Sequence, residues 1–122
     1  QSPVPVVNWS PQKKAVYAMG MYTKLYNNYL HRIALAVGLT VEEVKVMMMT
    51  EEGQTQLKAM IDASSLNEYQ RQVLRTRKKF LVGAEKAIQS YNFYIGLGEM
   101  PPAETEEALL NLIDQFEMMT VQ

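Results

Sequence analysis

The stretch SPQKKAVYAMGMYTKLYNNYLHRIALAVG, residues 10–38, decides the fold of this chain. Ser10 and Pro11 are typical of a helix start, because Ser caps free amides and Pro suits the first helical position. Gly38 is typical of a helix end. Between them, large apolar side chains recur at steps of three and four residues, as on one helix face: Val16, Met19, Tyr26, Leu30, Ile33 and Val37. We therefore predict a helix over residues 11–37.

Two short helices are expected directly after this one. Thr40 and Glu43 have the spacing of a capping box, and the helix that they start reaches Met48. Thr50 then caps a further helix, whose first turn is acidic and therefore suits the helix dipole. That helix is expected to end near residues 63–64.

A second long apolar face covers about residues 66–95. Ser65 is in place to cap this helix, and Gly96 and Gly98 are in place to end it. A last helix is expected over about residues 103–119.

These elements predict an all-α protein. The expected architecture is an elongated helical bundle with two long antiparallel helices, at about 11–37 and 66–95, bridged at one end by two short helices. The C-terminal helix packs back along the second long helix. Residues 1–9, which contain two prolines, are expected to be an extended N-terminal leader, and residues 10–122 a single helical domain.

Composition excludes several classes of protein. The 122 residues are 48% hydrophobic and 20% charged, which is enough to form a buried core. A net charge of -1 excludes a strongly basic arm for nucleic acid. There is no cysteine and only one histidine, His31, so thiolate and multi-histidine metal sites are excluded. No apolar run approaches the roughly 18 residues of a membrane-spanning helix.

Catalytic chemistry has little support in the sequence. The adjacent acids at 42–43, 51–52 and 106–107 lie in first turns of expected helices, where capping and the helix dipole explain them. Motifs for phosphate binding, serine hydrolysis or zinc proteolysis are absent from the sequence. We therefore predict a non-enzymatic protein with no cofactor, no metal and no catalytic residues.

Residues 33–44, IALAVGLTVEEV, resemble the helix-turn-helix of bacterial repressors. Ala34 stands for the small residue of the first helix, Gly38 for the turn and Val44 for the apolar anchor. The resemblance implies that the helix after Gly38 reads DNA. That helix begins with Glu42 and Glu43, whose carboxylates would be repelled by phosphates. The alternative is a tight corner between packed helices, and we expect no sequence-specific binding of duplex DNA.

A basic run lies on the second long helix. Residues 71–86 carry six cations against the single acid Glu85, a local charge of +5: Arg71, Arg75, Arg77, Lys78, Lys79 and Lys86. This face could bind an acidic partner. Alternatively, it is neutralised by the acids of residues 99–117, if the last helix packs against it.

Two further features suggest protein contacts. Tyr22 and Tyr29 are seven residues apart, on a stripe beside the main apolar face of the first helix, where a second protein or a second copy could bind. Met48 belongs to three consecutive methionines, of which at least one should be exposed on an adaptable docking surface. The candidate partner-binding residues are Tyr22, Tyr29, Arg71, Arg75, Lys79 and Met48.

These patterns predict a bacterial helical adaptor that acts by helix-face contacts in an envelope or secretion assembly. Gln1 can follow the cleavage site of a signal peptide, which favours a periplasmic or secreted protein. The alternative is a cytoplasmic nucleic-acid-associated or regulatory protein that uses the Gly38 corner or the basic face.

Overall fold

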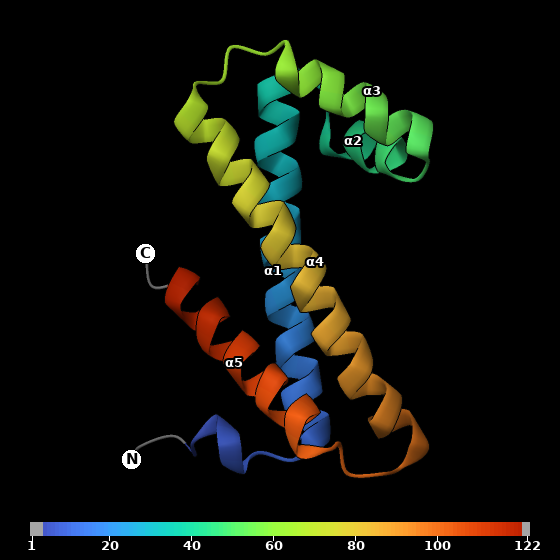
Figure 1. Ribbon diagram of the computed structural model, residues 1–122, viewed down its shortest axis with the longest axis vertical. Coiled ribbons are helices and arrows are strands. Elements are labelled where there is room, and N and C mark those ends of the chain that lie inside the picture. Colours follow the sequence, from blue (N-terminus) through green and yellow to red (C-terminus); the bar gives the residue numbers. More distant parts are fainter. Residues whose placement is uncertain (1–3, 121–122) are drawn as a thin grey trace. The chain divides into compact units, whose positions relative to one another are not determined.

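The structure is a computed structural model that describes residues 4–120, and the side chains of residues 4–119. This range contains no strand. Its elements are a short 3-10 turn and five α-helices (Figure 1): η1 (Val6–Asn8), α1 (Pro11–Val37), α2 (Val41–Met48), α3 (Glu51–Asp62), α4 (Glu68–Leu97) and α5 (Ala103–Thr120). The predicted all-α class is confirmed.

The first long helix has the bounds that its sequence predicts. α1 ends at Val37, and Gly38 adopts a φ of 73°, a left-handed conformation that glycine reaches without steric cost. This conformation lets the Leu39 N–H donate to the Ala34 carbonyl at 3.1 Å. The bond satisfies one of the free carbonyls at the helix end.

The predicted caps of both short helices are present. At the start of α2, Thr40 Oγ1 accepts from the Glu43 N–H at 3.1 Å, and Glu43 Oε1 accepts from the Thr40 N–H at 2.9 Å. At the start of α3, Thr50 Oγ1 accepts from the Gly53 N–H at 3.0 Å. Each bond satisfies an amide that the helix itself leaves free.

Both predicted ends of α4 need correction by two residues. The N-cap is Asn67 and not Ser65. The Asn67 side chain accepts a hydrogen bond from the Gln70 N–H, and the Gln70 side chain accepts one from the Asn67 N–H. At the other end, Gly96 remains inside the helix. Gly98, with a φ of 72°, is the residue that ends it.

The segment before α1 differs from the expected extended leader over residues that the structure describes. Val6–Asn8 form one 3-10 turn, and the Trp9 indole N–H donates to the Val4 carbonyl at 3.0 Å. The Trp9 ring also packs edge-on against Tyr17, with 5.2 Å between ring centroids. Burying an aromatic ring against α1 favours a turn over extended chain here.

The helices form two compact units. Unit 1 comprises Gln1–Lys24 and Phe80–Gln122, and unit 2 comprises Leu25–Lys79. α1 and α4 therefore contribute to both units (Figure 1). The single domain expected over residues 10–122 stays a prediction.

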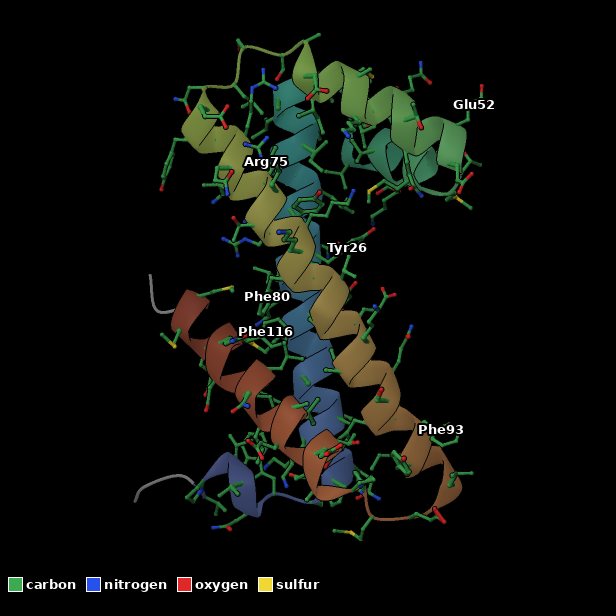
Figure 2. All side chains as sticks on the ribbon, viewed as in Figure 1. Tyr26, Glu52, Arg75, Phe80, Phe93 and Phe116 are labelled. Atoms are coloured by element: carbon green, nitrogen blue, oxygen red, sulfur yellow. The ribbon has the colours of Figure 1, made fainter. Side chains whose placement is uncertain are left out.

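The core of unit 1 lies between α1, α4 and α5. The rings of Phe80 and Phe116 meet edge to face, with 5.4 Å between centroids (Figure 2). Around them, the buried apolar side chains come from all three helices: Ala15, Ala18, Leu81, Ala84, Ile88, Tyr91, Leu109, Leu112 and Ile113. Such burial is the main favourable term in folding.

The predicted apolar face of α1 is wrong in its first turns. Val16 is 73% exposed and Met19 is exposed as well, whereas Ala15 and Ala18 are buried. The prediction chose the largest apolar side chains, but the contacting face here consists of small ones, which let α1 approach its neighbours closely. Further along, Leu30 and Ile33 are buried as predicted.

The core of unit 2 depends on a close approach between α2 and α3. A Cβ on Gly53 would lie 2.0 Å from the Met47 carbonyl oxygen, closer than any real side chain could come. The glycine therefore allows the two short helices to pack. Behind them, Val44 and Leu57 are buried.

Candidate partner-binding groove

Unit 2 contains an open groove of about 390 Å³. Its walls come from α1, the end of α2, α3 and the first turns of α4. The residues that line it are Tyr29, Ile33, Met48, Gln54, Leu57, Lys58, Ile61, Asp62, Arg71, Leu74, Arg75 and Lys78. A volume of this order is typical of sites for small ligands or for a few side chains of a partner.

The floor of the groove is apolar. Ile33, Leu57 and Leu74 are buried there, and the Tyr29 side chain is only 6% exposed. Burial, with a smaller contribution from Tyr26, raises the pKa of the Tyr29 phenol. The phenol therefore stays protonated over the physiological range and can donate a hydrogen bond to a bound group.

The rim of the groove is cationic. Lys58 of α3 and Lys78 of α4 are exposed there, and no described carboxylate lies within ion-pair distance of either ammonium. Arg75 is also exposed, and its guanidinium donates to Glu68 Oε1 at 2.6 Å (Figure 2 shows its place on α4). Asp62 is the one acid among the lining residues. The rim thus favours a negatively charged group.

Arg71 has a structural role that the sequence did not indicate. Its guanidinium donates to the carbonyls of Ile61 (3.0 Å), Asp62 (3.1 Å), Ser64 (3.0 Å) and Leu66 (3.2 Å). These carbonyls belong to the end of α3 and the loop that follows, where the helix cannot satisfy them. Arg71 therefore binds its own chain, and its assignment as a contact for a partner stays a prediction.

The groove brings together four of the six predicted contact residues: Tyr29, Met48, Arg71 and Arg75. Lys79 is exposed but does not line the groove. Tyr22 belongs to unit 1, where its hydroxyl donates to Glu85 at 3.1 Å.

Tyr22 and Tyr29 therefore do not form one exposed stripe on α1, and their role as contacts for a partner stays a prediction. Tyr29 is buried in unit 2, while Tyr22 is half-buried beside α4 in unit 1. Tyr29 is buried together with its neighbours Leu30 and Ile33, so the contacting face of α1 in unit 2 is wider than the predicted apolar face.

The three consecutive methionines agree with the prediction. Met49 is exposed, and Met48 is half-buried, with its sulfur 3.9 Å from the Tyr26 hydroxyl. Met48 also forms part of the groove wall. A thioether at this place can adapt to the shape of a bound side chain.

The corner at Gly38 has the packing that both a helix-turn-helix and a plain tight corner between helices require. Ala34 and Val44 are both buried. Glu42 and Glu43 are exposed in the first turn of α2, where the bonds to Thr40 lower the pKa of Glu43. The residues that would face DNA therefore present carboxylates, which do not suit phosphates.

A buried polar network in unit 1 was also missed. Lys14 of α1 is buried, and its ammonium donates to Glu106 Oε2 of α5. The Tyr91 hydroxyl of α4 donates to Glu106 Oε1 at 2.8 Å, and burial together with this carboxylate raises the pKa of the Tyr91 phenol. No sequence signal distinguishes Lys14 from the exposed Lys13 beside it.

The acids of α5 are the groups expected to neutralise the basic run of residues 71–86. The described ion pair of α5 joins Glu106 to Lys14 of α1, and Glu117 of α5 accepts from the Tyr17 hydroxyl at 3.1 Å. Residues 71–79 of the run belong to unit 2, whereas α5 belongs to unit 1. Neutralisation of the run by α5 stays a prediction.

A second hollow in unit 2, of about 500 Å³, lies between α1 and the start of α4. Exposed Leu35 and Tyr69 stand at its edge, and Arg32 is the one charged residue in its lining. It lacks the cationic rim of the groove, so it offers weaker selection for charge.

No family model, curated protein or solved structure matches this chain. Over residues 4–120, no helix is both long and apolar enough to cross a bilayer. The same residues hold no group of three or more acids or histidines that could bind a metal ion.

Proposed function

We propose that this protein is a non-enzymatic interaction protein that holds an acidic, partly apolar segment of a partner protein in the groove of unit 2. The observation that carries the proposal is the combination of a buried apolar floor with Lys58 and Lys78 on the rim. An apolar floor favours leucine-like side chains, and the cationic rim selects acidic neighbours over basic ones.

The floor and the rim make different contributions to binding. Burial of apolar side chains against Ile33, Leu57 and Leu74 supplies affinity. The rim charges are exposed, so they mainly raise the association rate and exclude basic segments. Tyr29 can add one hydrogen bond to a carboxylate or a carbonyl that enters the groove.

The experiment measures binding of a fluorescein-labelled synthetic peptide in which leucines one helical turn apart are flanked by glutamates. The test variant is Lys58→Glu with Lys78→Glu, because the Arg71 guanidinium already bonds the carbonyls at the end of α3 and Arg75 already pairs with Glu68. We expect about tenfold weaker binding in the variant, and a smaller difference between the two proteins at high salt.

Two controls make the measurement specific. Lys24→Glu with Lys86→Glu introduces the same charge change at exposed residues outside the groove and should leave binding almost unchanged. A peptide with lysines in place of the glutamates should bind much more weakly to the natural protein. Equal binding of both peptides, or equal loss in both double variants, would contradict the proposal. Tighter binding of a duplex oligonucleotide would favour the nucleic-acid alternative.

A further inference from the structure

Unit 1 carries an exposed apolar surface at the turn between α4 and α5. We call the residues Phe93, Leu97, Glu99, Met100 and Glu104 the turn surface. Phe93 and Leu97 are one helical turn apart on α4 and are 61% and 56% exposed, and Met100 is 75% exposed (Figure 2 labels Phe93). Exposed apolar side chains that are neighbours on one helix face, as Phe93 and Leu97 are, typically mark a contact site for another protein.

The segment of the chain that contains the turn surface is acidic, whereas the segment of α4 that lines the groove is basic. Residues 87–120 contain no lysine or arginine and carry six acids: Glu99, Glu104, Glu106, Glu107, Asp114 and Glu117. Residues 71–79 contain five cations and no acid. These two regions therefore carry opposite charges, although the whole chain has a net charge of only -1.

The two surfaces also match in their apolar parts. The turn surface offers three exposed apolar side chains, and the exposed acids Glu99 and Glu104 belong to the same segment of the chain. The groove offers an apolar floor flanked by Lys58 and Lys78. A groove of about 390 Å³ has room for a few side chains of a turn, but not for a whole helix face.

We infer that the occupant of the groove is the turn surface of a second copy of this chain. The inference rests on the proposed function, because it names the acidic, partly apolar segment that the groove would hold. Each copy has one groove and one turn surface, so the contact is heterologous. Such contacts build a ring where the rotation closes and an open filament where it does not.

The test is sedimentation velocity over a range of protein concentrations. The natural protein should show an average mass that rises with concentration, and added salt should reduce the rise.

Lys78→Glu changes the groove and Glu99→Lys changes the turn surface, and each alone should weaken self-association by about tenfold. Met100→Ser should weaken it too, whereas Val16→Ser, at an exposed residue outside both surfaces, should not. Helicity and thermal unfolding should be unchanged in all four variants.

Mixing the two charge variants provides the decisive comparison. The groove of the Glu99→Lys variant and the turn surface of the Lys78→Glu variant are both natural, so an equal mixture should recover association that each variant alone has lost. A mixture that associates no more strongly than either variant alone would contradict the inference.

Each outcome separates this inference from the proposed function. A monomer at every concentration, or association that both charge variants retain, overturns the inference. If that monomer still binds the acidic synthetic peptide through Lys58 and Lys78, the proposed function stands. If the monomer binds no peptide, both fail.

Discussion

Unit 1 and unit 2 share α1 and α4 but place their charged side chains differently. In unit 1, Lys14 and Glu106 meet between three helices, and the buried Tyr91 completes their hydrogen bonds. In unit 2, Lys58 and Lys78 stand at the rim of an open groove without a described acidic partner within ion-pair distance. Buried charges that are paired favour one arrangement of the helices, whereas solvent-exposed charges beside an apolar floor are available to a ligand.

The largest expected effect is in unit 1. Glu106→Ala leaves the Lys14 ammonium and the Tyr91 hydroxyl buried without their acceptor, so we expect a loss of about 3 kcal/mol in the free energy of unfolding. Urea unfolding followed by circular dichroism measures it. Amide exchange should rise more in α5 than in α2 and α3.

The matched control is Glu107→Ala, on the same helix turn, where the acid is exposed. It should change the free energy of unfolding by no more than about 0.5 kcal/mol. Similar losses in the two variants would contradict a structural role for the buried network.

A smaller effect is expected where α2 and α3 meet in unit 2. Gly53→Ala would place a methyl group 2.0 Å from the Met47 carbonyl oxygen, so the two backbones must separate. Overpacking of this kind costs about 1–3 kcal/mol, and alanine returns up to about 1 kcal/mol through its better helix propensity. We expect a net loss of about 2 kcal/mol in the free energy of unfolding, with faster amide exchange in α2 and α3.

Gly83→Ala is the control for this prediction. Gly83 lies within α4, and a Cβ there would meet no atom within 4 Å. The same substitution should therefore stabilise the protein, by about 0.5–1 kcal/mol. Stabilisation by Gly53→Ala as well would show that α2 and α3 do not need their close approach.

The smallest effect concerns pH and the cap of α2. The bonds with Thr40 lower the pKa of Glu43 below its ordinary value of 4.5. Its contribution to stability is therefore present above the unfolded-state pKa and is lost as the pH falls through the lower folded-state pKa. Glu43→Gln keeps an acceptor for the Thr40 N–H but cannot titrate.

The Glu43→Gln variant should be slightly less stable than the natural protein at neutral pH and equally stable in acid. Thermal unfolding over this pH range tests the prediction. Glu42→Gln serves for comparison. The Glu42 Oε1 lies 3.8 Å from the Lys45 Nζ, and this residue does not cap the helix. A difference in stability that grows on acidification would contradict a stabilising role for the ionised Glu43 carboxylate.

The helices of this protein could be predicted well because their boundaries depend on local chemistry. The residues that begin or end these helices satisfy backbone amides or carbonyls only a few positions away. This holds for the pair Thr40 and Glu43, for Thr50 and for the turn at Gly38. The start of α4 is harder to predict because two residues can each begin a capping box. Ser65 is followed three positions later by Glu68, and Asn67 is followed three positions later by Gln70.

The site could be predicted only in part because a groove depends on contacts between distant segments. Arg75 and Met48 were selected for charge and adaptability, and both line the groove. Lys58 was missed, because its position on the rim follows from how α3 packs. The structural role of Arg71 could not be predicted, because only the packed structure shows that carbonyls at the end of α3 and after it accept its hydrogen bonds.

The division of the chain into units has a consequence for the order of folding during synthesis. Unit 2 is one continuous segment, Leu25–Lys79, whereas unit 1 joins two segments that are separated by all of unit 2. The ion pair between Lys14 and Glu106 can form only after Glu106 has been synthesised, 92 residues later. Contacts over such separations form slowly, and domains generally fold as their residues emerge from the ribosome. A nascent chain can therefore complete its groove while the first turns of α1 still expose the side chains that α5 will later cover.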